Sequence, residues 1–405
     1  MLTSLHRVGK LALAIGVAAL GAGTVTFGSV ASADPTGGPS WIPGFKTTII
    51  LSGSRLHHRF TPEGVATATA LVTEPLADPD DITRLGNSIF AGFQNGVGPQ
   101  GQPNTDGNPD STVVEFTSTG HVLGQWDVTG KTDGLTADPA VGGVIATVNE
   151  DANSSLYVIH PAWASAAGTV IHYQYNKPLP HDGGTDAISI DGKKIFISAS
   201  APGTTGAPAP EPTYPAVYSV TLDPTSRVAS VTPLFDDEDT ATVVNAYSAQ
   251  FGKTIGLALT DPDSNEIVPW GARFGGDFML TSQGDLQQIY VSGAWTSFQH
   301  LSVLNLSQSV DDTAWPVSFT GTLYATDSID DTVAAINGPF RPGQPMVAAT
   351  PCGSNSAPAT CPGPGYTANY LATLNPWTGQ VSAVNVTGQA FTPQGGLLFV
   401  PGFAW

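Results

Sequence analysis

The sequence VYSVTLDP at residues 217–224 joins a strand pattern to a turn, and it returns as YLATLNPWTG at residues 370–379. In both stretches apolar residues alternate with small polar ones, and Asp or Asn followed by Pro ends the run, which is typical of a strand leading into a hairpin turn. Comparable short runs recur along the chain, and no long stretch keeps the period of a helix. The pattern therefore predicts an all-β fold.

A second apolar run recurs at intervals that suit a repeated four-stranded unit. It is found at residues 89–91, 144–146, 195–197, 255–257, 323–325 and 397–399. A radial array of four-stranded sheets is a β-propeller. We predict a six-bladed β-propeller of four-stranded blades over residues 46–405, with seven blades as the alternative. We expect N- and C-terminal strands to close the ring in one blade, with 47–51 and 65–72 as its outer strands and 389–400 as its inner two.

The repeat resembles the broad NHL and YVTN group of bacterial propellers. The resemblance is carried by an Asp ahead of the inner strand and by the hairpins Leu222-Asp223-Pro224 and Leu374-Asn375-Pro376. It covers most of the chain after residue 46. It implies an architecture and no single activity.

The first 33 residues have the features of a secretory signal peptide. A basic start precedes an apolar run at 11–20, and Ala31-Ser32-Ala33 forms an A-x-A cleavage site. A retained anchor is the alternative, because residues 11–30 carry no charge. We expect an exported monomer, secreted or in the cell envelope, with residues 34–45 as a leading segment and no membrane span in the mature chain.

Two cysteines, Cys352 and Cys361, lie nine residues apart. An exported protein meets an oxidising compartment, so we expect a disulfide between them. A metal site or a reactive thiol pair is the alternative.

The chain is strongly acidic. It has 14 Lys and Arg against 33 Asp and Glu, a formal net charge of -19 at pH 7, which argues against nucleic acid as a partner. The acids concentrate in segments that a propeller would place on one face. We therefore expect an acidic tunnel mouth that attracts cations.

One polar residue precedes each recurring strand and is a candidate for the rim of that tunnel. These residues are Asp81, Asp133, Asp186, Asn245, Asp312 and Gln389. Carboxylate and amide oxygens are ligands that Ca²⁺ prefers, so the set predicts a calcium site. The alternative is that each side chain accepts hydrogen bonds within its own blade.

A second candidate calcium site alternates oxygen-bearing side chains along one loop. Its residues are Asn104, Asp106, Asn108, Asp110 and Glu115, spaced as in a calcium loop. Pro109 stands where such a loop has Gly, so a polar turn is the alternative.

Aromatic residues near the same face are candidates for stacking on sugars or organic cations. They are Trp270, Trp295, Trp315 and Tyr247. For Tyr247 and Trp315, packing within a blade is the alternative.

No G-x-S-x-G, H-E-x-x-H, P-loop or C-x-x-C motif is present. We therefore predict a binding module that takes Ca²⁺ and a small-molecule, carbohydrate or protein ligand.

The alternative function is a Ca²⁺-dependent hydrolase or lactonase. Thr61-Pro62-Glu63-Gly64-Val65 resembles the early Pro-Glu-Gly of the gluconolactonase and senescence-marker propellers. The resemblance implies a tunnel metal held by Glu63 with Asn149, Asn245 and Asp186. The Ser-Pro-Asp-Gly segment of that group is not evident here.

Overall fold

The computed structural model describes residues 44–63, 71–163, 168–180, 183–200, 214–352 and 368–402. They belong to a single compact unit, Pro43–Trp405. The expected signal peptide lies outside the described residues. Within these ranges, no helix is long and apolar enough to cross a membrane. Cys361 also lies outside them, so its disulfide with Cys352 stays a prediction.

The described chain is built from β-strands and one short 3-10 turn, η1 (Gly53–Arg55), as predicted. A first sheet has the order β4-β5-β6-β7. Its strands are β4 (Pro79–Leu85), β5 (Ser88–Phe93), β6 (Asp110–Phe116) and β7 (Val122–Thr129). β5 is buried along its whole length, whereas β7 alternates between half-buried and exposed residues, so the sheet runs from an inner to an outer strand.

An eight-stranded sheet contains two similar groups, joined by parallel pairing of β11 with β15. The first group is β8 (Thr132–Asp138), β9 (Gly143–Val148), β10 (Ser155–Ile159) and β11 (Val170–Tyr175). The second is β12 (Ile188–Asp191), β13 (Lys194–Ser198), β14 (Pro215–Asp223) and β15 (Val228–Asp236).

A six-stranded sheet has the order β17-β16-β21-β20-β19-β18. Its main strands are β18 (Pro262–Ile267), β19 (Phe278–Ser282), β20 (Gln287–Ser292) and β21 (His300–Asn305). The outer additions are β16 (Thr240–Val243) and β17 (Thr254–Gly256). The predicted strand at 255–257 therefore lies at the outer edge of this sheet, and β19 takes the place expected for it.

The last two sheets are interleaved along the chain. One has the order β22-β25-β26-β27, and the other has the order β28-β1-β24-β23-β29. The first contains β22 (Val310–Ala314), β25 (Met346–Ala349), β26 (Tyr370–Leu374) and β27 (Val381–Ala383). The second contains β1 (Phe45–Ser52), β23 (Gly321–Asp327), β24 (Thr332–Asn337), β28 (Val386–Gly388) and β29 (Leu397–Pro401). The chain thus leaves the first sheet after β22, builds β23 and β24 in the second, and returns.

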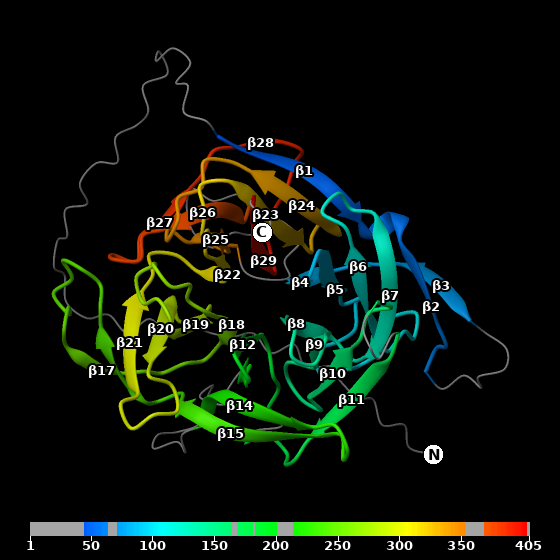
Figure 1. The fold of residues 1–405 in the computed structure, drawn as a ribbon, viewed down its shortest axis with the longest axis horizontal. Helices are drawn as coiled ribbons and strands as arrows, with labels where there is room; N and C mark the ends of the chain where they lie inside the picture. Colours follow the sequence, from blue (N-terminus) through cyan, green and yellow to red (C-terminus); the bar gives the residue numbers. More distant parts are fainter. Residues whose placement is uncertain are drawn as a thin grey trace, which may run out of the picture. The chain divides into compact units, whose positions relative to one another are not determined.

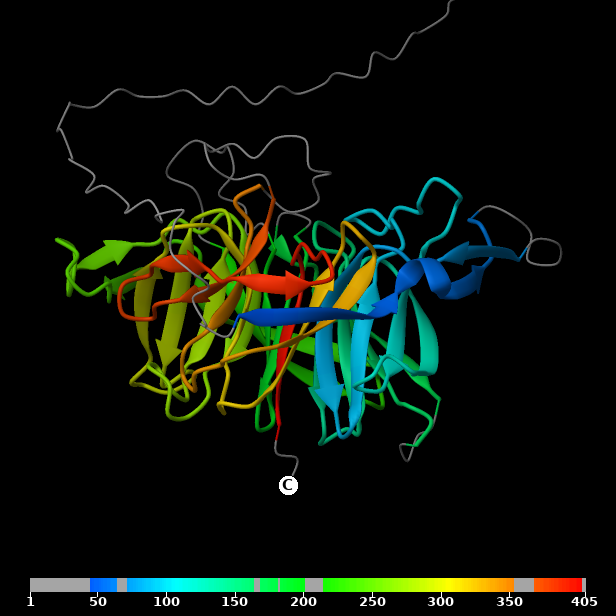
Figure 2. The same cartoon turned by 90° about the horizontal axis from the view of Figure 1, so that it is seen from above.

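N-terminal β1 and C-terminal β29 lie in the same sheet, but the segments of the chain that supply its inner and outer strands differ from our expectation. β29 is innermost, β23 and β24 follow, and β1 pairs with β24. Figure 2 shows β28 and β1 side by side on the outside. The residues expected as a further outer strand lie partly outside the described ranges, and β3 (Val72–Pro75) pairs instead with β2 (His57–Phe60) in a separate hairpin.

The sheets surround a central cavity in the manner of a β-propeller (Figure 1). The strands that line this cavity, here called the innermost strands, are β4, β8, β12, β18, β22 and β29. Each contacts the next around the ring, and β29 contacts β4. Apolar clusters fill the space between neighbouring sheets. In one of them the rings of Phe196 on β13 and Phe278 on β19 lie 5.0 Å apart.

The turns that decided the predicted fold are held by their own side chains. In the β14–β15 hairpin, Asp223 Oδ1 accepts the N–H of Thr225 at 2.9 Å. After β26, Asn375 Oδ1 accepts the N–H of Trp377 at 2.9 Å. Both are the local bonds expected of Asx turns, so the hairpin prediction is confirmed at both places.

Candidate functional site

A β-bulge near the start of the innermost strands sets the geometry of the site. The register shifts between Pro79 and Ile82 on β4, where one extra residue is inserted, and the same one-residue insertion occurs on β8, β18 and β22. A bulge re-aims side chains that regular pleating would direct elsewhere. Here two consecutive bulge residues line the central cavity on β4, β18 and β22, and one, Asp133, does so on β8.

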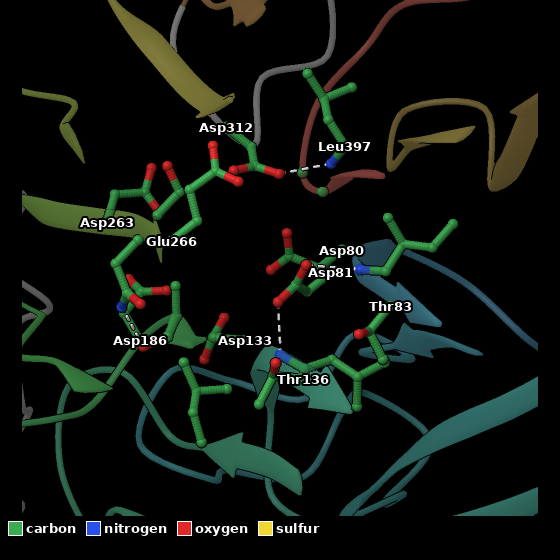
Figure 3. Close-up of a pocket in the computed structure, with 18 of the residues that line it drawn as sticks. Asp80, Asp81, Thr83, Asp133, Thr136, Asp186, Asp263, Glu266, Asp312 and Leu397 are labelled. Carbon is green, nitrogen blue, oxygen red and sulfur yellow. Dashed lines mark hydrogen bonds between the residues drawn. The ribbon is translucent and has the colours of Figure 1, made fainter. Parts of the chain in front are cut away.

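The first bulge position carries an aspartate on four of these strands, and Asp186 precedes β12 at the matching place. The set is Asp80, Asp133, Asp186, Asp263 and Asp311, here called the aspartate ring. On the remaining innermost strand, β29, the matching residue is Gly395, which also lines the cavity. Figure 3 shows the labelled carboxylates of the ring converging from different strands.

The ring lies between two adjoining cavities of about 180 and 80 Å³. The smaller cavity adds Glu150 and Asp261 to its lining, and the larger adds Glu266. Among the described residues, Lys131 is the one basic side chain that lines either cavity. The wall of the two cavities is thus rich in acidic side chains, most of them on or next to the innermost strands, and the acidic tunnel mouth expected from the loops of one face stays a prediction.

Lys131 neutralises one side of the ring. Its Nζ lies 3.0 Å from Asp133 Oδ1 and also contacts Glu150. Burial would lower the pKa of Lys131, but the charges of Asp133 and Glu150 outweigh burial and raise it. The ammonium group therefore stays charged in the cavity wall.

Amide side chains donate hydrogen bonds to three of the ring carboxylates. Gln94 Nε2 donates to Asp80 Oδ2 at 2.5 Å and to Asp133 Oδ1 at 3.0 Å. Gln283 Nε2 donates to Asp311 Oδ1 at 2.8 Å. Both glutamines follow the strand next to an innermost strand, but Gln94 joins two ring carboxylates, whereas Gln283 joins Asp311 to Thr350.

The second bulge position has a structural role on two strands. Asp81 accepts the N–H of Ile82 at 2.6 Å and that of Leu135, on β8, at 2.5 Å. Asp312 likewise accepts the N–H of Thr313 at 2.7 Å and that of Leu397, on β29, at 2.6 Å. These two carboxylates line the cavity but their oxygens already tie neighbouring strands together.

Burial and mutual repulsion raise the pKa values of the acids. Burial is the larger cause, and neighbouring carboxylates add to it for Asp80, Asp186 and Asp263, whose pKa values lie well above the ordinary range. The pKa values of Asp133 and Asp312 are raised to about 7. Deprotonating all of these groups together is therefore unfavourable unless a cation enters.

Several buried oxygens that line the larger cavity have no hydrogen-bond partner among the described residues. They are Asp133 Oδ2, Ser189 Oγ, Asn265 Oδ1 and Glu266 Oε1. An unpaired buried polar atom costs about 1–3 kcal/mol. Water or a bound cation in the cavity would satisfy these atoms. No group of three His, Cys, Asp or Glu side chains within the described ranges is arranged to hold a metal ion.

The structure brings four of the six predicted rim residues to the cavity: Asp81, Asp133, Asp186 and Asp312. Asn245 lies elsewhere, since its amide donates to Asn305 O and Thr378 O at 2.7 and 2.8 Å beside the outer strand β21. Gln389 Oε1 accepts the N–H of Ile49 on β1. Asn245 and Gln389 therefore do not line the central cavity as predicted, because the strands that follow them do not occupy the expected positions in their sheets.

The predicted loop from Asn104 to Glu115 is a hydrogen-bonded polar turn. Asn104 Oδ1 accepts the N–H groups of Asp106 and Asn108 at 2.9 and 3.0 Å, and Asn108 Oδ1 accepts that of Asp110. Glu115 instead accepts Trp163 Nε1 at 2.8 Å. The amide oxygens of Asn104 and Asn108 are thus occupied by the loop's own backbone, and Asp110 Oδ1 accepts Thr129 Oγ1 at 2.8 Å, as in the polar-turn alternative.

The predicted aromatic residues do not line the central cavity. Trp315 is buried in an apolar cluster, and Trp295 packs against another. Trp270 and Tyr247 are on the surface, 87% and 98% exposed. The packing alternative therefore holds for Trp315 but not for Tyr247.

The metal set implied by the lactonase resemblance is not assembled. Of its members, Asp186 lines the cavity. Glu63 lies beside Gly107, whose carbonyl accepts its N–H at 3.0 Å. Asn149 uses its side chain to bind Lys131 N and Asn153 O.

Sequence reasoning missed Asp80, Asp263 and Asp311 as members of the ring. In the structure, each of these aspartates is followed two positions later by the residue that resumes regular pairing, which the sequence alone does not reveal.

Comparisons with solved structures find remote similarity, of which three examples follow. The chain is similar to a periplasmic gluconolactonase of Pseudomonas aeruginosa, with 13% identity and a TM-score of 0.41 over 88% of this chain and 99% of that one. It is similar to a streptogramin B lyase, with 10% identity and a TM-score of 0.36 over 85% and 94%. It is also similar to the hydrazine synthase of Kuenenia stuttgartiensis, with 15% identity and a TM-score of 0.36 over 77% and 67%.

No family model matches the sequence, and no curated protein sequence matches it at a significant level. The resemblance to the NHL and YVTN group therefore stays a prediction.

Proposed function

We propose that this chain is an exported β-propeller binding module that takes a cation in its central cavity, with Ca²⁺ as the expected ion. The aspartate ring is the observation that supports this function. Its five carboxylates share a buried space with the single ammonium of Lys131. A bound cation would offset their repulsion and restore the charged form of each acid.

Six blades fit the proposal better than seven. The innermost strands β4, β8, β12, β18, β22 and β29 support this number, because each begins a set of strands running outward. The chain alternates between the last two sets of strands, which makes the closing blade unusual. The number of six blades is therefore part of the proposal.

A calcium ion in this cavity would keep part of its water shell. Ca²⁺ takes six to eight oxygens, and the described side chains offer no preformed group of three. Asp263 and the unpaired oxygen of Asn265 would be its protein ligands, whereas both oxygens of Asp311 already accept hydrogen bonds, from Gln283 Nε2 and Gly395 N. Water would supply the remainder.

The test is thermal melting of the protein at low ionic strength, with chelator and then with Ca²⁺, followed by titration calorimetry. Ligand at 100 times its Kd stabilises a protein by about 2.7 kcal/mol. We expect the melting temperature to rise with Ca²⁺ and the rise to disappear in Asp263→Asn. An unchanged melting temperature together with no heat of binding would contradict the calcium proposal.

A Ca²⁺-dependent hydrolase is the second candidate. The observation in its favour is the pair of cavity acids Asp133 and Asp312, whose pKa values of about 7 suit general acid-base catalysis near neutral pH. A panel of lactones and esters tests it. Calcium-dependent turnover that Asp186→Ala abolishes would replace binding by hydrolysis as the function.

A further inference from the structure

A third cavity, of about 620 Å³, lies away from the aspartate ring and is here called the outer cavity. It is lined by Gln100 in the loop between β5 and β6, by residues 152–154 between β9 and β10, by residues 174–179 at the end of β11 and beyond it, and by Gly183. Among the described residues, none lines both the outer cavity and a central one. Its volume is within the range of about 300–1,000 Å³ that is typical of small-molecule sites.

Backbone hydrogen bonds hold the segments around the outer cavity in place. Asp151 N donates to Pro99 O at 3.0 Å, which ties the β9–β10 loop to the β5–β6 loop. Asn176 N donates to Ala229 O at 3.0 Å, which holds the chain after β11 against β15. The walls of the outer cavity are therefore preformed, and a ligand would not have to order them on binding.

Four exposed amide side chains line the outer cavity: Gln100, Asn153, Gln174 and Asn176. Two of them offer a free hydrogen-bond donor. Gln100 Oε1 accepts Gln102 Nε2 at 3.2 Å, and Asn176 Oδ1 accepts the N–H of Val231 at 3.1 Å. The amide nitrogens of Gln100 and Asn176 have no partner among the described residues.

The other two amides offer a free acceptor. Asn153 Nδ2 donates to Gln100 O at 3.3 Å, and Gln174 Nε2 lies 3.1 Å from His172 Nε2. Within the described ranges, Asn153 Oδ1 and Gln174 Oε1 have no partner. The outer cavity thus presents both donors and acceptors, each on a side chain whose other end is already bound.

The charge of the outer cavity differs from that of the rest of the molecule. The chain has a formal net charge of -19, and acids line both central cavities. Among the described residues that line the outer cavity there is no Asp or Glu, and Lys177 is the one charged side chain. The outer cavity is therefore not built to attract cations.

The mixture of free donors and acceptors decides the class of ligand. A carboxylate only accepts hydrogen bonds, so it would leave the oxygens of Asn153 and Gln174 unpaired. An ammonium group only donates, so it would leave the amide nitrogens of Gln100 and Asn176 unpaired. A hydroxyl group does both, and several hydroxyl groups on one molecule can therefore pair with all four amides.

We propose that the outer cavity binds a neutral mono- or disaccharide through these four amides. The inference goes beyond the cation function, because both the site and the class of ligand are different. Each hydrogen bond adds modestly to affinity, because the sugar exchanges bonds to water for bonds to the protein. Loss of one amide should therefore weaken binding without abolishing it.

The test is saturation-transfer NMR of the protein with glucose, galactose, mannose, maltose, cellobiose and trehalose, followed by titration of each sugar that binds. Glucuronate and glucosamine, which carry a carboxylate and an ammonium group, are measured alongside. We expect binding among the neutral sugars, with higher affinity than that of either charged one.

Two variants remove a free donor and keep the bond that holds the amide. Gln100→Glu and Asn176→Asp retain the oxygen that accepts a hydrogen bond and replace the free NH₂ group by oxygen. Each should weaken sugar binding about three- to tenfold, as expected for the loss of one hydrogen bond. Asn375→Asp is the matched control, because Asn375 Oδ1 also accepts a backbone N–H, in an exposed turn that does not line the outer cavity. Melting curves of all three variants check folding.

The outcomes separate this inference from the cation function. If no neutral sugar binds, or if Asn375→Asp weakens binding as much as Asn176→Asp, the inference is overturned and the cation function is untouched. Binding confined to glucuronate also overturns it, because it would indicate a carboxylate held by Lys177. Binding confined to glucosamine does the same, because it would indicate attraction to the protein's negative charge. Sugar binding in the presence of chelator supports the inference whether or not the protein binds Ca²⁺.

Discussion

Asp80 on β4 and Asp133 on β8 share one hydrogen-bond donor, since Gln94 Nε2 lies 2.5 Å from an oxygen of the first and 3.0 Å from an oxygen of the second. Two carboxylates held this close cannot both ionise freely. The hydrogen bonds from Gln94 therefore hold two acidic groups close together in the wall of the cavity. The stability of the protein should depend on protons and cations for this reason.

We expect the cation-free protein to lose stability as pH rises. The aspartate ring and Asp312 have folded pKa values raised above the unfolded value near 3.9. The folded state therefore holds more protons, and the free energy of unfolding falls from about pH 4 through pH 7 and above. Melting in chelator at pH 5, 6, 7 and 8 measures this. A melting temperature that rises across this range would contradict the raised pKa values, and Asp263→Asn should flatten the fall.

Lys131→Met should destabilise the protein strongly. The change leaves Asp133 and Glu150 without their cation, and removing one partner of a buried pair costs about 3–5 kcal/mol. The loss should be larger at pH 8 than at pH 5, where Asp133 is protonated. Chemical denaturation measures it, with exposed Lys193→Met as the control. Equal effects of the two substitutions would show that Lys131 does not neutralise the ring.

Gly395→Ala should disturb the place where the aspartate ring is interrupted. Gly395 has φ +94, and an added Cβ would lie 2.6 Å from Asp80 O and 2.6 Å from Thr326 Oγ1. Gly142 also has a positive φ, +64, but open space around it. We expect about 1–2 kcal/mol of destabilisation for Gly142→Ala, from the backbone alone, and at least ~3 kcal/mol for Gly395→Ala. Similar losses would mean that the close approach to β4 relaxes.

His58 should fasten the β2–β3 hairpin in a pH-dependent way. Its Nε2 lies 3.0 Å from Glu74 Oε1 and its Nδ1 lies 3.4 Å from Asp127 Oδ1 on β7. Burial lowers its pKa, but bonds to the two carboxylates outweigh burial and raise it above 6.5. This contribution is fully present below the unfolded pKa and is lost as pH rises through the folded one.

Hydrogen exchange of the hairpin amides checks that relationship. His58→Gln should speed their exchange on the order of tenfold at pH 6, whereas His57→Gln, at the adjacent exposed position, should not. Exchange that is unchanged by His58→Gln would assign the hairpin's attachment to its other contacts.

The sequence was sufficient for strand content and turns, because these depend on local chemistry. Asp133 and Asp186 were found because each precedes a readable strand, β9 or β13, that does lie next to an innermost strand. The sequence also predicted Asp81 and Asp312, each of which follows a ring aspartate by one position in the chain. In Asp80-Asp81 and Asp311-Asp312 only the bulge decides which carboxylate enters the ring, and a bulge is a property of strand pairing.

Long-range pairing explains what the sequence could not predict. Asp263 was passed over in favour of Asn245 because the run at 255–257, which overlaps β17, reads as the recurring strand, although β16 and β17 pair outside β21. The chain crosses between the last two sheets because β22 pairs with β25 and not with β23, which is nearer in the sequence. No local pattern records that choice.

The most direct test of a cation in the central cavity is anomalous diffraction from crystals soaked in Tb³⁺, a stand-in for Ca²⁺. We expect an anomalous peak inside the larger cavity, beside Asp263 and Asp311, which is absent from crystals of Asp263→Asn. Peaks confined to surface carboxylates, with ordered water alone inside the aspartate ring, would contradict the proposed function.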